Sequence, residues 1–415
     1  MEYRCIGERL THSFSREIHN RIASYPYELC ELTPSALDGF LRRREFRAIN
    51  VTIPYKQAVL PYLDEISEQA EKIGAVNTIV NRAGKLSGYN TDFFGLSALL
   101  ARIGIRPAGA KTLVLGTGGT SKTACAVLES LGASEIIRVS RTGREGSLTY
   151  DEALKNHRDA SYLINTTPCG MFPAEDAQPV RLCEFPALRG VADVIYNPLR
   201  TPLVSEALKA GIPAEGGLYM LVSQAVAASA LFTGTEFPQN LTETVFRTIF
   251  AEKENIVLTG MPGCGKTTVG KLLAARLSRP FLDLDERIEA AAGMPVTEIF
   301  RLRGESGFRE LEEKVIGEQA APLTGWVIAT GGGAVLRDIN VARLKRNGRI
   351  FLIDRAPDTL VPTPDRPLAL SREAIRKRYE ERYERYFGTC DTVVHAGGSP
   401  EETAERLLSL REAAL

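Results

Sequence analysis

The chain is poor in the residues that mark several large classes of protein. It has one tryptophan and four histidines, and the histidines do not cluster with cysteines, so we expect no structural zinc site. The seven cysteines are scattered, odd in number and free of C-x-x-C pairs. This usage fits a reducing cytosol and argues against a disulfide framework.

An excess of charge and a long apolar run are missing as well. Lysine plus arginine and aspartate plus glutamate both number 51, so nothing favours a nucleic-acid or membrane-surface partner. The longest apolar run, near residues 221–232, is broken by Ser223 and Gln224 and is too short to span a bilayer. Residues 1–14 carry Glu, Arg and His without an apolar core, so we expect no signal peptide and a cytoplasmic location.

What the chain does contain is a regular alternation of short apolar strands and amphipathic helices. Its 415 residues are enough for two or three domains, and its 44% hydrophobic and 25% charged residues are ordinary for a globular protein. Alternating strands and helices without internal repeats predict the α/β class with mainly parallel sheets.

A phosphate-binding loop is the most specific motif. Apolar residues 256–259 lead into a G-x-x-x-x-G-K-T string, and a helical segment follows at 269–277. Strand, glycine loop and helix in that order predict backbone N–H groups that cradle phosphates, with Lys266 reaching the outer phosphates and Thr267 facing Mg²⁺. An ordinary glycine-rich turn is the alternative. The loop consists of Gly260, Gly263, Cys264, Gly265, Lys266, Thr267 and Thr268, with Met261 and Pro262 between them.

Acidic, glycine-rich and arginine-containing segments follow the loop. Asp283 and Asp285 are spaced i, i+2, which on a strand would place both carboxylates on one face toward the phosphates. One could bind Mg²⁺ through water, and the other could accept a proton or bond a substrate hydroxyl group. Gly331–Gly333 follow an apolar strand, where a backbone approaches a ligand. Residues 355–370 are rich in Pro and Asp and predict a lid that contains Arg366. Arg382 lies in a charged helix, for which a solvated face is the ordinary interpretation.

An earlier segment, residues 111–142, reads as a dinucleotide-binding unit. A strand leads into Gly116-x-Gly118-Gly119, then a helix and a second strand that ends at Ser140. NAD-binding proteins place an acid at that strand end, but here Arg141, Thr142 and Arg144 follow, which suits the 2′-phosphate of NADP. Two solvated loop arginines are the alternative.

The first hundred residues offer a candidate acid–base pair. Lys56 follows a strand that ends at Pro54, and Asp92 precedes a helix. A buried Lys–Asp pair could keep an ammonium group charged beside a substrate hydroxyl and protonate a forming alkoxide. Taken singly, Lys56 is a solvated lysine and Asp92 a helix N-cap. Likewise, Ser13 and Ser15 could grip a carboxylate or cap a helix.

Together these strings show that the first 248 residues or so resemble shikimate dehydrogenase, with matches that run in order along their length. The matching strings are His12-Ser13-x-Ser15, Asn50-Val51-Thr52-x-Pro54-x-Lys56, Gly74-Ala75-Val76-Asn77-Thr78, Asn90-Thr91-Asp92, the Gly116–Gly119 loop, Asn165-Thr166-Thr167-Pro168, Tyr196-Asn197-Pro198 and Gly217-Leu218-x-Met220-x-x-x-Gln224. The resemblance makes Lys56 and Asp92 the catalytic pair. It assigns the substrate to Ser13, Ser15, Thr52, Asn77 and Gln224. It assigns NADP to Gly116, Gly118, Gly119, Ser140, Arg141, Thr142, Thr166, Tyr196 and Gly217.

Residues 254 to about 410 resemble shikimate kinase. The matching strings are Gly260–Thr268, Asp283-x-Asp285, Gly307-Phe308-Arg309-x-x-Glu312, Gly331–Gly333, Arg366-Pro367-Leu368 and Arg382-x-x-x-Tyr386. The resemblance makes Lys266 and Asp285 catalytic and gives Thr267 and Asp283 to Mg²⁺. It assigns shikimate to Asp285, Arg309, Gly331, Gly332, Gly333 and Arg382. ATP falls to the Gly260–Thr268 loop and Arg366.

We therefore expect a bifunctional enzyme that reduces 3-dehydroshikimate with NADPH and phosphorylates the product with ATP and Mg²⁺. An NAD-dependent quinate dehydrogenase and a regulatory module that has lost catalysis remain the alternatives. The partners are small-molecule substrates, with no nucleic acid or membrane, in a monomer or homodimer. The expected domains are a substrate domain at 1–103 completed by helices in 218–248, a Rossmann NADP domain at 104–217, a connector at 249–253, and a P-loop kinase domain at 254–415, which has the parallel sheet of the nucleoside-monophosphate kinases.

Overall fold

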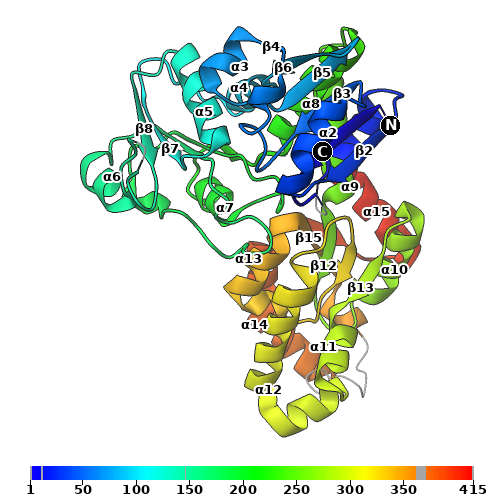
Figure 1. The fold of residues 1–415 in the computed structure, drawn as a ribbon. Helices are drawn as coiled ribbons and strands as arrows, with labels where there is room; N and C mark the ends of the chain where they lie inside the picture. Colours follow the sequence, from blue (N-terminus) through cyan, green and yellow to red (C-terminus); the bar gives the residue numbers. More distant parts are fainter. Residues whose placement is uncertain (1, 11–12, 145, 361–370, 414–415) are drawn as a thin grey trace. The chain divides into compact units, whose positions relative to one another are not determined.

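The structure is a computed structural model that describes residues 2–10, 13–144, 146–360 and 371–413. Contacts divide the chain into two compact units, Met1–Ile249 and Phe250–Leu415, which are called the first and second unit below. Each has its own sheets (Figure 1). Each also has its own hydrophobic core. They are described separately.

The first unit begins with a six-stranded mixed sheet. Its strand order is β2-β1-β3-β5-β6-β4, and β5 runs antiparallel to both β3 and β6. The antiparallel pair arises because only Ala83 and Gly84 connect β5 to β6, and both have positive φ, as a tight hairpin requires. The strands are β1 Tyr3–Gly7, β2 Tyr27–Glu31, β3 Ala48–Val51, β4 Glu65–Ile66, β5 Thr78–Arg82 and β6 Lys85–Tyr89.

The second sheet of this unit is fully parallel, as the βαβ pattern predicts. Its order, β11-β10-β9-β7-β8, places β7 between β8 and β9, where successive connections leave in opposite directions. In such sheets ligands bind at the carboxyl ends of the strands beside this switch point. The strands are β7 Lys111–Leu115, β8 Glu135–Val139, β9 Tyr162–Asn165, β10 Gly190–Asp193 and β11 Ala214–Glu215.

Helix starts in the first unit carry clear capping signals. Ser67 accepts the N–H of Ala70, and Thr149 forms a capping box with Glu152. The helices are α1 Ser15–Ile22, α2 Pro34–Arg43, α3 Glu68–Ile73, α4 Asp92–Arg102, α5 Gly119–Ser130, α6 Tyr150–Asn156, α7 Pro202–Lys209, α8 Leu218–Thr233 and α9 Leu241–Lys253, with short 3₁₀ turns η1 at Leu60–Tyr62 and η2 at Leu182–Glu184.

Helix α8 returns to the first sheet and packs against α4, α1 and β5. Its Ala228 and Phe232 join a core cluster with Tyr3 and Tyr27. The close crossing with α4 depends on Gly95, because a Cβ there would lie 2.6 Å from the Met220 carbonyl oxygen and 3.0 Å from Gln224 Cβ. Gly95 thus brings Gln224 close to the start of α4.

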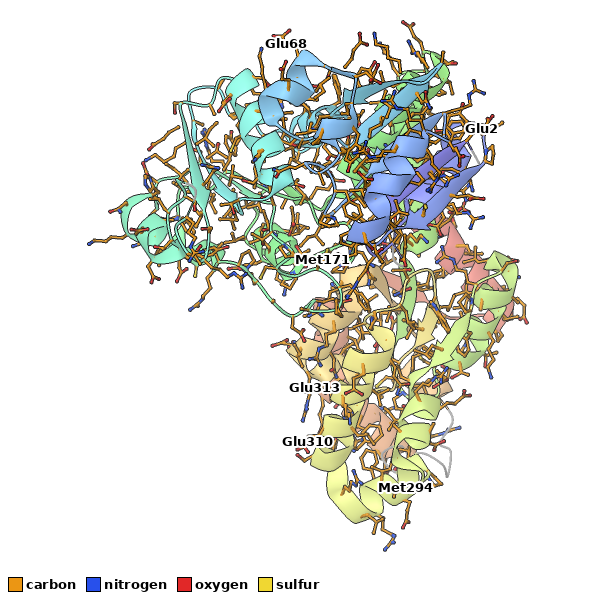
Figure 2. The ribbon with its side chains drawn as sticks, viewed as in Figure 1. Glu2, Glu68, Met171, Met294, Glu310 and Glu313 are labelled. Atoms are coloured by element: carbon orange, nitrogen blue, oxygen red, sulfur yellow. The ribbon has the colours of Figure 1, made fainter. Side chains whose placement is uncertain are left out.

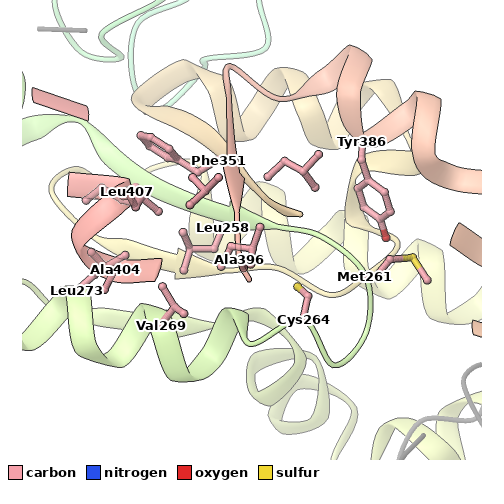
Figure 3. Packing of buried hydrophobic residues seen from close by; sticks show 14 of the residues in the cluster. Leu258, Met261, Cys264, Val269, Leu273, Phe351, Tyr386, Ala396, Ala404 and Leu407 are labelled. Atoms are coloured by element: carbon pink, nitrogen blue, oxygen red, sulfur yellow. The ribbon is translucent and has the colours of Figure 1, made fainter. Parts of the chain in front are cut away.

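The second unit is built on a five-stranded parallel sheet in the order β13-β14-β12-β15-β16. Figure 3 shows part of the core that joins the sheet to its helices, including Leu258, Val269, Leu273, Phe351 and Leu407. The strands are β12 Asn255–Thr259, β13 Phe281–Asp283, β14 Val327–Ala329, β15 Gly348–Asp354 and β16 Thr392–His395. The helices are α10 Lys266–Leu277, α11 Leu284–Ala292, α12 Val296–Val315, α13 Asp338–Asn347, α14 Arg372–Thr389 and α15 Pro400–Glu412, with short helical turns η3 at Ile316–Ala320, η4 at Ala334–Leu336 and η5 at Pro357–Thr359.

Residues 249–253, expected as a connector, form the last part of helix α9. No proline or glycine interrupts 241–253, so the helix continues to Lys253. Arg279 and Arg411 both donate hydrogen bonds to the carbonyl oxygen of Ala251, which satisfies an acceptor that a helix end leaves open. Of the helices in the described ranges, none is long and apolar enough to cross a membrane.

We predict that Gly95→Ala destabilises the first unit by about 1–3 kcal/mol, because the added methyl group overpacks the α4–α8 crossing. Urea titration followed by far-UV circular dichroism should show the loss, while the fluorescence transition of Trp326, in the second unit, should not move. Gly39→Ala in α2 is the matched control, since its Cβ would meet only the flexible end of Arg43 at 3.4 Å. Equal stability of the two variants would contradict the prediction.

Candidate functional sites

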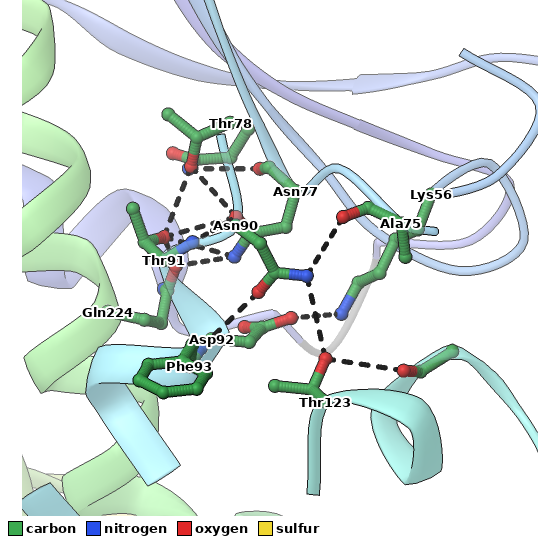
Figure 4. A network of polar contacts seen from close by, with 12 residues as sticks. Lys56, Ala75, Asn77, Thr78, Asn90, Thr91, Asp92, Phe93, Thr123 and Gln224 are labelled. Carbon is green, nitrogen blue, oxygen red and sulfur yellow. Dashed lines mark hydrogen bonds and ion pairs between the residues drawn. The ribbon is translucent and has the colours of Figure 1, made fainter. Parts of the chain in front are cut away.

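A buried ion pair marks the site of the first unit. Lys56 Nζ donates to Asp92 Oδ2 at 2.6 Å, and the two side chains are only 15% and 10% exposed. Asp92 is the first residue of α4, with Thr91 in the N-cap position, so the helix dipole favours its negative charge. The structure therefore brings together the two residues that the sequence placed 36 positions apart (Figure 4). Removing one partner of such a pair costs about 3–5 kcal/mol, because the other charge stays buried.

A polar wall stands next to this pair. Asn77, Thr91 and Gln224 come from three different segments and hydrogen bond to one another within 3.0–3.4 Å (Figure 4). All three are buried. Two of them, Asn77 and Gln224, are predicted substrate residues, and Thr91 joins them. Amide and hydroxyl groups held this way suit a ligand with several hydroxyl groups.

The predicted substrate serines lie at the start of α1. Ser13 Oγ donates to Ser15 Oγ at 3.0 Å and accepts the Ser15 N–H at 3.3 Å, while the N-cap residue of α1 is Phe14, which makes no side-chain capping bond. Ser13 also hydrogen bonds to Tyr196, whose ring lies 5.3 Å from that of Phe14. Burial raises the pKa of Tyr196 to about 12, so its hydroxyl stays protonated. Tyr196, predicted for the cofactor, thus lies beside the substrate serines. Thr52, the remaining predicted substrate residue here, directly follows β3 and donates its N–H to Ile6 O.

The glycine loop after β7 leaves the start of α5 open. Gly116 has φ 111°, and a Cβ there would lie 2.7 Å from Thr166 Oγ1, so only glycine fits. At Gly118 and Gly119 a Cβ would meet no atom within 4 Å. A helix N-terminus with this open approach is suited to a phosphate group. Gly217, by contrast, is needed for packing, because a Cβ there would lie 2.0 Å from the Val194 carbonyl oxygen.

The end of β8 presents exposed side chains where the 2′-phosphate is expected. Arg141, Thr142 and Arg144 are all exposed. Ser140, by contrast, holds the turn itself, since its Oγ lies 2.7 Å from Ser147 Oγ and accepts the Gly143 N–H. Exposed guanidinium groups suit a phosphate, whereas Ser140 contributes to the shape of the loop.

Asp193 organises the two turns that follow β9 and β10. It accepts hydrogen bonds from Asn165 at 3.0 Å, Thr201 at 2.7 Å and the Ile195 N–H at 3.1 Å. Complete burial raises the pKa of its carboxyl group to about 6, although all three donors favour the charged form. The loop after β9 continues to Met171, which is 41% exposed and labelled in Figure 2.

The second unit contains a cavity of about 480 Å³ at the carboxyl ends of its strands. Most of the residues that the sequence assigned to this site line it together. Cys264 instead packs its side chain in the core, so it offers a ligand only its backbone. The predicted residues that line the cavity are Gly263, Gly265, Lys266, Thr267, Thr268, Asp283, Asp285, Arg309, Gly331, Gly332, Gly333 and Arg382. Gly260 lies at the start of the loop with φ 144°, and Arg366 falls outside the described residues.

The phosphate loop holds its lysine and threonine in place. Lys266 Nζ donates to the Gly260 and Met261 carbonyl oxygens at 2.9 and 3.0 Å, and Thr267 Oγ1 donates to Asp283 Oδ2 at 2.7 Å. The expectation that Asp283 and Asp285 share one strand face is wrong. Asp283 caps helix α11 by accepting the Asp285 N–H at 3.0 Å, so Asp285 is already helical. Both still line the cavity.

Two buried arginines share an acidic neighbour. Arg309 Nη1 donates to Glu312 Oε2 at 2.6 Å, and Arg309 Nη2 lies 3.3 Å from Glu305 Oε1. The same Glu305 oxygen lies 3.8 Å from Arg382 Nη2. Burial raises the pKa of Glu312, and the positive charge of Arg309 partly offsets this rise. Glu305 is 48% exposed, so its carboxylate reaches both arginines from the solvent side.

The three glycines after β14 make room for these arginines. A Cβ at Gly333 would lie 2.1 Å from Arg309 Nη2, and one at Gly331 would lie 2.7 Å from Asp285 Oδ1. The Gly332 carbonyl oxygen accepts hydrogen bonds from Arg382 at 3.1 Å and from the Tyr386 hydroxyl. Backbone and arginines therefore form one wall of the cavity.

Three contributors had no role assigned from sequence. Glu312 could have been found from its i, i+3 spacing to Arg309 on a helix. Glu305 and Asp193 had weaker signals, since their partners include residues 77 and 28 positions away. Contacts of that separation follow from the fold and not from local pattern.

Comparison with known families identifies both halves. The model of the shikimate dehydrogenase substrate binding domain matches residues 5–79, and that of shikimate kinase matches residues 262–411. A shikimate dehydrogenase (NADP(+)) of Clostridium perfringens is 34% identical over 268 residues, which are 58% of this chain and 95% of the relative. A shikimate dehydrogenase (NADP(+)) of Methanopyrus kandleri is 37% identical, and the match covers 56% of this chain and 90% of that relative.

Solved structures give the same result. Shikimate dehydrogenase 1 from Peptoclostridium difficile matches with a TM-score of 0.56 and 32% identity over 60% of this chain and 98% of that chain. A shikimate 5-dehydrogenase from Thermus thermophilus in complex with NADP(H) and shikimate has a TM-score of 0.54 and 32% identity over 60% and 99%. The chain belongs to the shikimate dehydrogenase family and, through residues 262–411, also contains a shikimate kinase domain, so it is a dehydrogenase–kinase fusion.

Proposed function

We propose that this protein catalyses two consecutive reactions. The first unit reduces the 3-keto group of 3-dehydroshikimate with NADPH, and the second unit transfers the γ-phosphoryl group of ATP to the hydroxyl that the reduction creates. The observation that carries the proposal is that one chain holds the buried Lys56–Asp92 pair, at 2.6 Å, and also a phosphate-loop cavity lined by Arg309 and Arg382. The product of the first reaction is the substrate of the second.

In the reductase, Lys56 donates a proton to the oxygen that becomes the new hydroxyl. Asp92 aims the ammonium group of Lys56, because Nζ donates to Asp92 Oδ2 at 2.6 Å. NADPH, when bound, supplies the hydride. Asn77 and Gln224 hold substrate hydroxyl groups, and Thr52, Ser13 and Ser15 complete the substrate pocket.

The cofactor contacts lie along the parallel sheet. We assign the 2′-phosphate to Arg141 and Thr142, with Ser140 shaping the turn, and the pyrophosphate to the start of α5. The exposed arginine side chain and the open helix N-terminus fit these groups. They favour NADP over the NAD of a quinate dehydrogenase. The remaining cofactor contacts are assigned to Gly116, Gly118, Gly119, Thr166, Tyr196 and Gly217.

In the kinase, Lys266 must leave the loop carbonyls to reach the phosphates of ATP. Thr267 and Asp283, 2.7 Å apart, would hold Mg²⁺, which supplies charge neutralisation. Asp285 is the base for the shikimate hydroxyl, and the guanidinium groups of Arg309 and Arg382 bind the shikimate carboxylate. Gly331–Gly333 lie against the substrate. The phosphate loop from Gly260 to Thr268 and Arg366 complete the ATP site.

We place the substrate domain at 1–103 with the helices of 218–248, the Rossmann domain at 104–217 and the kinase domain from 254 onward. The separate sheets β1–β6, β7–β11 and β12–β16 support this division. We also infer a cytoplasmic enzyme, monomeric or homodimeric, that acts on small molecules. All seven cysteines are free, as suits a reducing compartment.

Single substitutions should separate the two activities. Lys56→Ala should lower NADPH oxidation by roughly 10²–10⁴-fold, because the proton donor is lost, and should leave ATP-dependent phosphorylation of shikimate intact. Lys266→Ala should do the reverse. Lys72→Ala, at an exposed lysine, is the control and should change neither rate. Loss of both activities in either variant, or absence of one in the unaltered protein, would contradict the proposal.

Glu305 occupies the position toward which a substrate carboxylate would bind, so removing its charge should help the substrate. We predict that Glu305→Gln lowers the KM of the kinase for shikimate by up to about five-fold, a limit set by the partial exposure of the pair. Glu310→Gln, on the same helix and labelled in Figure 2, is the control. A higher KM in Glu305→Gln would mean that Glu305 holds the arginines in their binding geometry.

A further inference from the structure

We propose that Tyr27 is a positioning residue of the reductase, which fixes the orientation of the Asn77 amide through Asn50 and Thr78. Tyr27 lies on β2, is 2% exposed and donates its hydroxyl group to Asn50. The inference rests on the proposed role of Asn77 in binding substrate. It adds a residue that acts on that role from behind the pocket.

A continuous line of hydrogen bonds joins the two residues. The Tyr27 hydroxyl donates to Asn50 Oδ1 at 2.6 Å, and Asn50 Nδ2 donates to Thr78 Oγ1 at 3.2 Å. Thr78 Oγ1 in turn donates to Asn77 Oδ1 at 3.0 Å. All four residues are buried, so water cannot replace a missing partner (Figure 4 shows the part from Thr78 to Asn77).

Backbone groups fix the direction of this line. The Thr91 N–H donates to Asn77 Oδ1 at 2.7 Å, so that atom must be the oxygen of the amide. The backbone carbonyl oxygen of Asn77 can only accept, and it lies 3.4 Å from Asn50 Nδ2. This end of the Asn50 amide must therefore be the nitrogen. Asn50 therefore turns its oxygen toward Tyr27. Burial raises the pKa of Tyr27 well above its usual value, so the hydroxyl remains a donor.

The orientation of Asn50 and Thr78 determines which atoms of the Asn77 amide face the substrate pocket. Asn77 Oδ1 accepts the Thr91 N–H at 2.7 Å and the Thr78 hydroxyl group at 3.0 Å. The Asn77 amide nitrogen donates to Thr91 Oγ1 at 3.0 Å and, over a longer distance of 3.4 Å, to Gln224 Oε1, so the bond to Gln224 is the one that a substrate hydroxyl group can replace. Without the Tyr27 hydroxyl, Asn50 keeps a buried oxygen without its donor, and the line can relax to other orientations.

The test compares Tyr27→Phe with Tyr55→Phe. Tyr55 is 3% exposed and donates to the Leu32 carbonyl oxygen at 2.6 Å, so each variant loses one hydrogen bond of the same length within the same sheet region, buried for Tyr27 and part-buried for Tyr55. We expect Tyr27→Phe to raise the reductase KM for shikimate by about five-fold, the equivalent of one hydrogen bond, and Tyr55→Phe to leave it unchanged. The KM for NADP should stay the same in both, which shows that the first unit is folded.

The kinase of the same chain supplies a second control, because it binds the same shikimate and should keep its KM. A double-mutant cycle with Asn77→Ala then separates positioning from general loosening: in the Asn77→Ala background, Tyr27→Phe should have no further effect on KM. Equal KM values for Tyr27→Phe and Tyr55→Phe, or a full Tyr27→Phe effect in that background, would overturn the proposal. If Asn77→Ala alone leaves KM unchanged, the proposed role of Asn77 fails first, and that of Tyr27 with it.

Discussion

The buried contact between Lys56 and Asp92 is the interaction on which the first unit depends. An ammonium and a carboxylate withdrawn from water must stay paired, and the pair comes from the turn that follows β3 and from the start of α4. Those two elements must therefore meet in one way. Helix α8 holds α4 through the close approach at Gly95, and the same crossing delivers Gln224 to the pocket. The crossing of α4 and α8 therefore determines the positions of both the catalytic Asp92 and the substrate residue Gln224.

The second unit also contains a buried ion pair, but both of its residues lie on the same helix. The pair is Arg309 with Glu312, and the guanidinium group lies so close to Gly333 that a Cβ there would be 2.1 Å from Arg309 Nη2. Arg309 pairs with both Glu312 and Glu305, and the same Glu305 carboxylate lies 3.8 Å from Arg382. A substrate carboxylate would replace one of the protein's carboxylates as the partner of these arginines. The guanidinium groups would therefore keep a negatively charged neighbour throughout binding. In both units, buried charge is arranged before any ligand arrives.

Sequence reasoning succeeded where the signal is local. The strand–glycine–helix order at Gly260–Thr268 and the strand at Lys111–Leu115 form as predicted, because their geometry is set by neighbours in the chain. It failed where a local competitor was overlooked: Asp283 caps α11, which removes Asp285 from the strand. It could not reach Tyr27, whose effect passes through partners 23 to 51 positions away and depends on which strands pair.

The central claim is that one chain carries out reduction and phosphorylation in succession. The most direct measurement supplies the purified protein with 3-dehydroshikimate, NADPH, ATP and Mg²⁺, and follows NADPH oxidation together with the formation of shikimate 3-phosphate. The account predicts that both proceed and that, once the 3-dehydroshikimate is consumed, one ADP has formed for each NADP. Oxidation of NADPH with shikimate as the only product, or no oxidation at all, would contradict it.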